Sequence, residues 1–298
     1  MKNQQGTTEF IEANNGLDIL KTMKFTAHNI RLHKNITTFS LRQKKKDTSI
    51  VQEVTGIDYS TVPVITEMPS YIGINKLLQL VGFDKRKTNL SMIDLGCLEG
   101  GYAIEFARSG YKNVVGIEGR KSNFDKCQIL SNYLGLENLN FRHDDVKNFE
   151  SYKEVYDVVL CLGLLYHLDS PIEFLQKVNR CMSDNGVMIL ETHYAPKNKY
   201  EHDNFFLPKV YPNKNKSEIA YLGHSYEGCW WHEYSPDTPE NKRHPWSAVS
   251  NHKSFVPTLQ SLMEALYNTG FKQVYAIQNP IINKIEENWC RVMWACFK

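Results

Sequence analysis

The sequence predicts an α/β fold in which helices cover both faces of a largely parallel β-sheet. Three observations predict it: short apolar runs alternate with helix-like segments between residues 90 and 193, a glycine-rich turn follows the first run, and acidic residues follow the second and third. This alternation is typical of parallel sheets, because each crossover helix packs on a sheet face. Ligands of such sheets bind beyond the carboxyl ends of the strands, so the acidic residues mark a candidate site.

The composition is that of a globular protein with a full core. The chain has 298 residues, of which 42% are hydrophobic and 23% charged, enough for one large or two ordinary domains. The formal net charge of +2 creates no strong field toward nucleic acid or an anionic membrane. The N-terminus lacks the apolar core of a signal peptide, and no apolar run approaches the length of a membrane span. We therefore expect a cytoplasmic protein without a membrane partner.

Residues 1–67 are predicted to form an N-terminal extension and residues 68–298 the main domain. The extension is polar and carries a basic cluster from Arg42 to Lys46. A phosphate-contacting arm and a solvated surface both explain this cluster, and the solvated surface is favoured. Residues 68–83 place apolar side chains at helical spacing, which predicts an amphipathic helix capped near Ser70.

The segment Leu90–Gly101 combines a buried strand with a glycine-rich turn. Its apolar run is interrupted only by Asp94, and the glycines after it let the backbone approach a ligand closely. The hydride-transfer fingerprint G-x-G-x-x-G would need a second glycine where Leu98 stands. A carboxylate at the strand end repels phosphate and suits a ligand that carries an ammonium group. The pattern Asp94-x-Gly96-x-x-x-Gly100 therefore favours S-adenosylmethionine over NAD.

The remaining elements follow from the order of apolar runs, amphipathic segments and turn residues. We expect helices at 101–109, 120–134 (with Gly135 as C-cap), 147–154, 170–183 and 258–268, strands at 113–119, 139–143, 156–163, 187–192, 271–277 and 289–297, and a turn at 184–186. From about 194 to 253 the alternation stops. A structureless loop of that length is unusual, so this stretch is predicted to be a lid or substrate insert with structure of its own.

At this point the chain resembles the class I S-adenosylmethionine-dependent methyltransferases. The resemblance rests on the Asp94 to Gly100 pattern, on Glu118 after the second strand, on Asp145 after the third and on Asp-Val-Val-Leu in the fourth. It covers about residues 90–193 and, more loosely, 257–298. The family implies a seven-stranded Rossmann-like methyltransferase sheet, here with an N-terminal helical extension and a lid-like insert. It also implies S-adenosyl-L-methionine as cofactor and S-adenosyl-L-homocysteine as product.

The candidate cofactor residues lie at the carboxyl ends of the predicted strands. Glu118 offers only acceptor oxygens and can take both ribose hydroxyls, although an exposed loop acid is the alternative. By the resemblance, Asp144 or, better, Asp145 accepts from the adenine amino group, and helix capping is the alternative for either. We expect the cofactor to be bound by Asp94, Gly96, Cys97, Gly100, Tyr102, Glu118, Asp144, Asp145, Val146 and Leu162.

The segment from Gly163 to Pro171 carries the candidate catalytic residues. It resembles the stretch after strand four in the branch that includes the tRNA wobble-uridine carboxymethyltransferase, where a Tyr-His pair faces the methyl-transfer cavity. His167 is the first candidate for base or acceptor-orienting group, with Tyr166 beside it and His193 next; a structural histidine is the alternative. The basic residues expected to hold a carboxylated cofactor are not identifiable, so ordinary S-adenosylmethionine is expected.

The insert is rich in histidine and aromatic residues. Six of the chain's ten histidines lie between residues 193 and 252, but their spacing matches no standard metal site, and no metal is predicted. A metal that assists a vicinal-diol acceptor is the less favoured alternative. Residues 223–234 are expected to form an aromatic, polar-tipped wall of a small-molecule pocket.

Methyl transfer to a hydroxyl needs a base, which a histidine supplies. The sequence therefore predicts a methyltransferase for a small polar or aromatic metabolite, with O-methylation slightly favoured over N-methylation. An RNA-modifying (tRNA) methyltransferase is the nearest alternative, although the small net charge does not favour a nucleic acid partner. A non-catalytic protein that binds S-adenosylmethionine is a further alternative.

Overall fold

The computed structural model describes residues 16–41, 59, 61–195, 216–239, 242–244, 246–277 and 290–298. The basic cluster from Arg42 to Lys46 and residues 196–215 of the predicted insert lie outside the described residues. The chain divides into two compact units. One comprises residues 1–89 and 97–143, and the other comprises residues 90–96 and 144–298.

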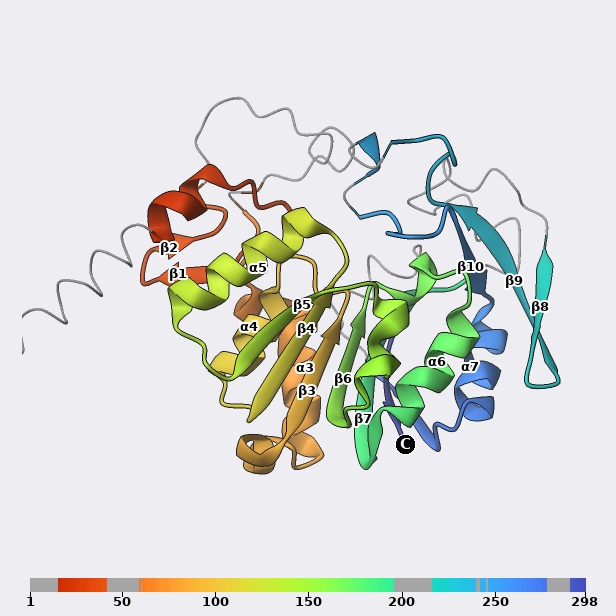
Figure 1. Cartoon of the computed structure of the whole chain (residues 1–298). Helices are drawn as coiled ribbons and strands as arrows, with labels where there is room; N and C mark the ends of the chain where they lie inside the picture. Colours follow the sequence, from red (N-terminus) through yellow and green to blue (C-terminus); the bar gives the residue numbers. More distant parts are fainter. Residues whose placement is uncertain are drawn as a thin grey trace, which may run out of the picture. The chain divides into compact units, whose positions relative to one another are not determined.

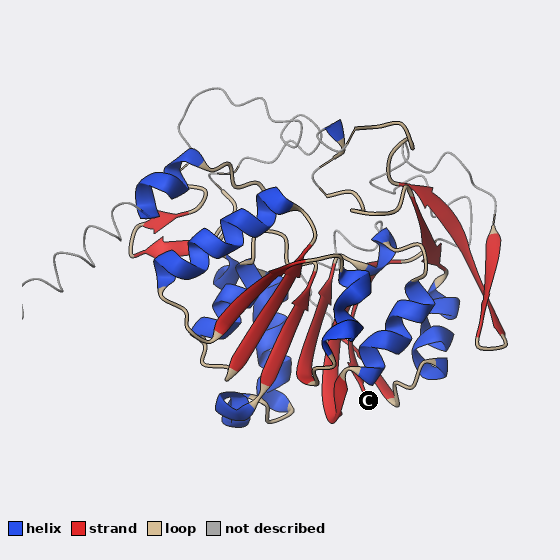
Figure 2. Ribbon diagram, viewed as in Figure 1, coloured by secondary structure: helices blue, strands red, loops and turns tan. Residues whose placement is uncertain are grey.

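Seven strands form the main sheet (Figure 2). They are β3 (Ser91–Leu95), β4 (Asn113–Glu118), β5 (Leu139–His143), β6 (Tyr156–Leu162), β7 (Met182–His193), β11 (Gln273–Ala276) and β12 (Arg291–Phe297). Their order is β11-β12-β7-β6-β3-β4-β5. β12 is antiparallel to β7 and β11, while β3/β6, β4/β5 and β6/β7 pair in parallel. The predicted seven-stranded α/β sheet is confirmed, and its strand order reverses at β3.

The sheet core follows directly from the apolar runs. Val158–Cys161 in β6 and Val187–Leu190 in β7 are completely buried. Parallel strands are buried on both faces, which requires continuous apolar runs rather than alternation. Burying each such side chain stabilises the fold by about 1.5–3 kcal/mol. These strands therefore give rigid support to the turns that follow their carboxyl ends.

The first unit carries the helices that follow β3 and β4 in the chain. Its elements are β1 (Arg31–His33), β2 (Ile36–Thr37), η1 (Ile65–Glu67), α3 (Pro69–Leu80), η2 (Asp84–Asn89), α4 (Gly101–Arg108) and α5 (Lys121–Leu134), with β4 and β5. Gly135 ends α5 at φ 61°, as predicted. Ser70 was expected to cap α3 but lies inside it, because Pro69 takes the first helical position.

The second unit adds a smaller sheet to its part of the main one. Its further elements are η3 (Val146–Tyr152), η4 (Leu165–His167), α6 (Pro171–Arg180), β8 (Ser217–Tyr221), β9 (His224–His232), β10 (Lys253–Pro257) and α7 (Leu259–Asn268). β8, β9 and β10 pair antiparallel in the order β10-β9-β8, and Figure 1 shows β9 and β10 beside α7. The insert thus has structure of its own. Thr258 accepts a hydrogen bond from the Ser261 amide and caps α7.

Two expectations about the second unit were wrong. The Asp-Asn-Gly sequence at 184–186 does not separate α6 from a strand, because β7 already begins at Met182. The register with β6 jumps from Tyr156↔Met182 to Val158↔Val187, so the extra residues form an irregularity inside the strand. β10 was also missed, because residues 253–257 lie between the end of the expected insert and the start of the expected helix at 258.

Candidate active site

The glycine turn, residues 96–101, joins β3 to α4. Gly96 has φ 70° and Gly100 has φ 74°, both in the left-handed region that favours glycine. A Cβ atom at Gly100 would lie 2.7 Å from the Phe141 ring and 3.1 Å from the Cys127 sulfur. The Cys97 amide donates to the carbonyl of Ile117 at the end of β4 (2.9 Å). The turn is therefore fixed by its backbone, and a side chain at position 100 would collide with Phe141.

Glu118, the last residue of β4, is buried rather than an exposed loop acid. Its side chain accepts the Leu98 amide (2.9 Å) and the Arg120 amide (2.7 Å), one on each oxygen. The Asn123 side chain also hydrogen-bonds to this carboxylate. Because a carboxylate offers about four acceptor sites, about one stays available for a ligand hydroxyl. Burial raises the pKa of this carboxyl to about 7. A buried carboxylate with a spare acceptor site, beside a turn whose glycines at 96 and 100 let the backbone come close, fits the ribose of the expected cofactor.

A second buried carboxylate, Glu99, holds the N-terminal segment against the glycine turn. Its oxygens accept the amides of Thr26, Ala27 and His28 at 2.9–3.0 Å, and Lys126 forms a 2.6 Å ion pair with it. The His28 Nδ1 in turn accepts the Gly101 amide (3.0 Å). Burial lowers the pKa of His28 to about 4, so its neutral ring can act as this acceptor. Sequence reasoning missed this connection, which spans more than 70 residues.

The other predicted cofactor residues occupy the expected ends of elements. Asp145 caps η3 by accepting the Lys147 amide (3.0 Å), and the Asp144 carboxylate accepts from Asn148 (3.0 Å) and from the Tyr152 hydroxyl. Asp145 thus has the capping role that was named as its alternative, and Asp144 bonds to neighbouring side chains. A contact of either residue with adenine stays a prediction. Three further candidates are placed as follows: Asp94 is buried in β3, Val146 is buried at the start of η3, and Leu162 ends β6.

Tyr102 lies in the first turn of α4. Its hydroxyl forms a 2.6 Å hydrogen bond with the hydroxyl of Ser70 in α3. The contact between Tyr102 and the cofactor stays a prediction. The hydrogen bond with Tyr102 gives the hydroxyl of Ser70, which does not cap its helix, a partner.

The three candidate catalytic residues lie together. Tyr166 and His167 are in η4, and His193 ends β7. The ring of Tyr166 is 4.2 Å from the ring of His167 and 4.7 Å from that of His193, centroid to centroid. Burial raises the pKa of Tyr166 to about 12, so its hydroxyl keeps its proton at neutral pH.

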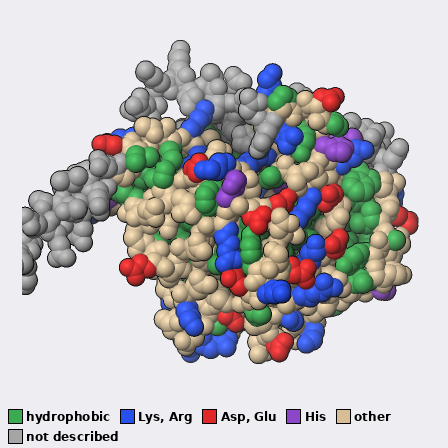
Figure 3. All heavy atoms as spheres, in the orientation of Figure 1, with side chains coloured by type: hydrophobic (Ala, Val, Ile, Leu, Met, Phe, Trp, Pro, Cys, Tyr) green, Lys and Arg blue, Asp and Glu red, His purple; other side chains and the backbone are tan. Residues whose placement is uncertain are grey.

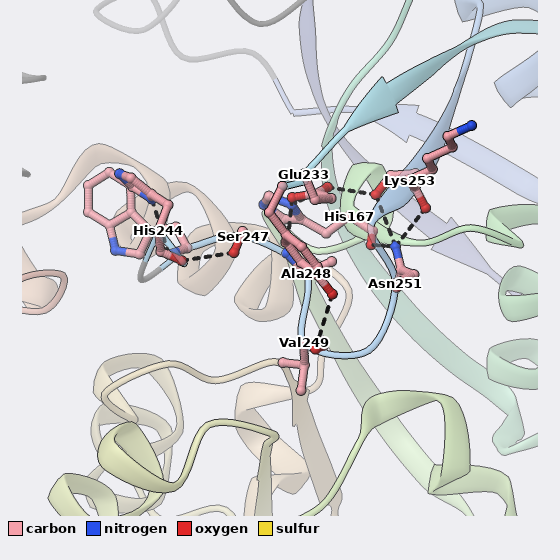
Figure 4. Close-up of polar contacts among 11 residues, drawn as sticks. His167, Glu233, His244, Ser247, Ala248, Val249, Asn251 and Lys253 are labelled. Atoms are coloured by element: carbon pink, nitrogen blue, oxygen red, sulfur yellow. Dashed lines mark hydrogen bonds and ion pairs between the residues drawn. The ribbon is translucent and has the colours of Figure 1, made fainter. Parts of the chain in front are cut away.

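Glu233, directly after β9, contributes a carboxylate to this group. Both its carboxylate oxygens lie within reach of the His167 Nδ1, at 2.9 and 3.0 Å (Figure 4). The Glu233 side chain is only 2% exposed. Sequence analysis placed residues 223–234, which include Glu233, in the expected pocket wall but assigned Glu233 no role of its own. We call Tyr166, His167, His193 and Glu233 the His167 cluster.

An ion pair between Glu191 in β7 and Arg291 in β12 lies beside the His167 cluster. A Cβ atom at Gly163 would lie 3.5 Å from the Tyr166 hydroxyl, 3.6 Å from a Glu191 oxygen and 3.9 Å from an Arg291 nitrogen. The glycine at the end of β6 therefore leaves the backbone close to polar groups of three different elements. Nothing in the local sequence indicated that Glu191 and Arg291 would pair.

The described residues contain no group of three or more His, Cys, Asp or Glu side chains that could hold a metal ion. Among the same residues, no helix is long and apolar enough to cross a membrane.

Two curated relatives are tRNA-modifying enzymes by name. The tRNA U34 carboxymethyltransferase of Trichodesmium erythraeum is 27% identical over 108 residues, covering 36% of this chain and 33% of that protein. Its counterpart in Campylobacter fetus subsp. fetus is 24% identical over 166 residues, covering 52% of this chain and 57% of that protein. The chain thus spans between a third and somewhat over half the length of these relatives.

Solved structures share the fold. The N-terminal domain of EvdMO1 with SAH bound has a TM-score of 0.54 and 21% identity, over 78% of this chain and 80% of that one. The same domain in the presence of SAH and D-fucose has a TM-score of 0.55 and 20% identity, over 82% and 88%. At these identities the likeness concerns the fold alone.

A family model described as a methyltransferase domain matches residues 71–276. The match begins in α3, ends in β11 and includes the glycine turn, Glu118 and the His167 cluster. It confirms the predicted resemblance to class I S-adenosylmethionine-dependent methyltransferases and the prediction that the protein is an enzyme. The chain belongs to the methyltransferase-domain family.

Proposed function

We propose that this methyltransferase takes its methyl group from S-adenosylmethionine and transfers it to a hydroxyl of a small polar or aromatic acceptor. The observation that carries the proposal is the juxtaposition of Tyr166, His167 and His193, with the Nδ1 of His167 bonded to a buried carboxylate. A hydroxyl is a poor nucleophile until its proton is removed, and a neutral imidazole is suited to remove it.

The cofactor supplies an electrophilic methyl group on a sulfonium. In the proposed step, a lone pair of the acceptor oxygen forms the new C–O bond while the S–CH₃ bond breaks, and the hydroxyl proton passes to Nε2 of His167. Tyr166, which stays protonated, and His193 orient polar groups of the acceptor. Glu118 and the glycine turn hold the nucleoside, so the main contribution of the chain is alignment of the two reactants.

A turnover assay tests the proposal. The purified chain is incubated with S-adenosylmethionine and panels of hydroxyl, amine and carboxylate acceptors, and S-adenosylhomocysteine formation is measured by mass spectrometry. D-fucose belongs in the hydroxyl panel because a neighbouring structure was determined in its presence. Turnover restricted to hydroxyl acceptors supports the proposal. Turnover of amines alone contradicts O-methylation, and S-adenosylhomocysteine binding without any turnover favours the non-catalytic alternative.

A tRNA acceptor is the second candidate, favoured by the names of the curated relatives and by the Tyr166-His167 segment that resembles that branch. The net charge of +2 does not favour it. On the face drawn in Figure 3, the described Lys and Arg side chains are interspersed with Asp and Glu. Titration with tRNA at increasing salt separates the candidates, because phosphate contacts weaken steeply as salt rises.

A further inference from the structure

Glu233 receives hydrogen bonds from three different segments. Besides the His167 Nδ1, its oxygens accept the Ser254 hydroxyl (2.6 Å) and the Ala248 amide (3.0 Å). Ser254 belongs to β10, and Ala248 to the connection between β9 and β10. The carboxylate is therefore held in one place by donors other than the histidine. Such a fixed acceptor can orient an imidazole, whereas a carboxylate on a free side chain cannot.

The backbone of His167 is held as well. The buried amide of Asn251 donates to the His167 carbonyl (2.9 Å), to the Lys253 carbonyl (2.8 Å) and to the Ser254 hydroxyl (3.2 Å) (Figure 4). Ring and main chain of His167 are thus both fixed by the segment that joins β9 to β10. A histidine that only filled space would need neither contact.

An ionised carboxylate accepts hydrogen bonds and donates none. The nitrogen that faces Glu233 must therefore carry the ring proton, which places the proton on Nδ1 and the lone pair on Nε2. When Nε2 takes a proton, the adjacent negative charge also stabilises the imidazolium that forms. Carboxylate–imidazole pairs perform both tasks in enzymes that use histidine as a base.

We infer that Glu233 is the positioning residue of the active site: it fixes the tautomer and orientation of His167, and thereby makes the β9–β10 segment part of the catalytic machinery. This inference rests on the proposed function, in which His167 is the base. It assigns to Glu233 no contact with the reacting atoms.

Two substitutions separate the charge of Glu233 from its hydrogen bonds. In Glu233→Gln, the carbonyl oxygen must face the Ala248 amide, since an NH₂ group there would oppose another donor. The NH₂ group then takes the place of the oxygen that faces the Ser254 hydroxyl, which can accept, and that lies 2.9 Å from the His167 Nδ1. The Nδ1–H keeps the carbonyl, at the position 3.0 Å away, as its acceptor. This variant keeps one acceptor for the histidine and loses the charge. Glu233→Leu loses both.

The first measurement does not depend on activity. Long-range ¹H–¹⁵N spectra of the cofactor-free chain report which ring nitrogen of His167 carries the proton. We expect Nδ1–H in the natural protein and in Glu233→Gln, and a population with the proton on Nε2 in Glu233→Leu. An Nε2–H tautomer in the natural protein would overturn the inference, whether or not an acceptor is known.

The second measurement is kcat with an acceptor that turns over. We expect a loss of about 10-fold in Glu233→Gln, since a charged hydrogen bond is roughly twice as strong as a neutral one. We expect a loss of about 10²- to 10⁴-fold in Glu233→Leu, the range of a general base. KM and the affinity for S-adenosylhomocysteine are expected to change little.

The double variant Glu233→Leu/His167→Ala distinguishes positioning from a structural role. If Glu233 acts through His167, the double variant is no slower than His167→Ala alone. Independent, multiplying losses would overturn the inference.

Ser254→Ala serves as a folded comparison if Glu233→Leu is unstable, because it removes one donor to the carboxylate but not the histidine contact. We expect a smaller loss of kcat than in Glu233→Gln. No turnover with any acceptor would refute the proposed function while the NMR result still tests Glu233.

Discussion

The glycine turn and the His167 cluster are built from different kinds of contact. In and beside the glycine turn, backbone amides hold a carboxylate. The amides of Leu98 and Arg120 donate to Glu118, which lies 20 and 2 residues away along the chain. In the His167 cluster, side chain meets side chain across 66 residues. The first region depends on backbone conformation, and the second on where a long insert folds.

This difference predicts different consequences of mutation. A change in the glycine turn should impair folding or cofactor affinity, because it alters the backbone that holds the nucleoside. A change in the His167 cluster should alter the rate while the cofactor still binds. Each experiment below measures stability, affinity and rate, so that the two regions can be separated.

The largest effect is expected for His167→Ala. Loss of a general base lowers kcat by about 10²- to 10⁴-fold for a hydroxyl acceptor. Calorimetry should find the affinity for S-adenosylhomocysteine unchanged. His33→Ala, at an exposed position on β1, is the matched control and should keep its rate. An unchanged rate in His167→Ala would mean that the His167 cluster does not control the rate, and the contrast with the glycine turn would be wrong.

Gly100→Ala tests whether the glycine turn depends on backbone conformation and close packing. An L-residue in the left-handed region costs about 1–2 kcal/mol, and the collision with Phe141 adds about 1–3 kcal/mol. Gly135→Ala is the control, because it has a similar φ of 61° and no atom within 4 Å of the added Cβ. Denaturant unfolding should show the larger loss at Gly100. Equal losses would mean that strain, not close packing, selects glycine there.

Glu118→Gln should weaken S-adenosylhomocysteine binding about 10- to 100-fold, since hydrogen bonds to a charged group contribute about 1.5–3 kcal/mol. Calorimetry measures the change. Glu137→Gln, at an exposed position after α5, should bind normally. If Glu118→Gln also binds normally, the proposed ribose contact is wrong.

The smallest expected effect is a pH dependence. Because burial raises the pKa of Glu118 to about 7, about one carboxyl in ten is ionised near pH 6. If the ionised form accepts the ribose hydroxyls, the affinity for S-adenosylhomocysteine should fall about tenfold from about pH 8 to about pH 6. A flat profile in the natural protein would contradict this role.

Stability should respond to the same group with the opposite sign. Between the ordinary value of 4.5 and about 7, the folded chain holds a proton that the unfolded chain has released. The free energy of unfolding contributed by Glu118 therefore decreases as pH rises through this window and levels off above it. Denaturant unfolding of Glu118→Gln should lack this component.

The sequence predicted best those features that are set locally. Gly96 and Gly100 adopt the positive φ values that the turn requires, and Gly135 ends α5 as expected. The Asp-Asn-Gly signal at 184–186 failed, because β7 begins at Met182, which pairs with Tyr156 of β6, and the Asp-Asn-Gly residues form an irregularity inside the strand. Tertiary pairing outweighs turn propensity where both compete for the same residues.

By itself, the sequence determined the alternating sheet, the glycine turn, the position of Glu118 and the candidates Tyr166, His167 and His193. Only the tertiary structure decided that Glu233 faces His167, that Glu191 pairs with Arg291 and that Glu99 holds the N-terminal segment. Apolar periodicity and glycine positions report on neighbours along the chain, because they reflect local backbone conformation and burial. Contacts between residues 60 or more positions apart depend on how whole segments pack, and no local pattern records that.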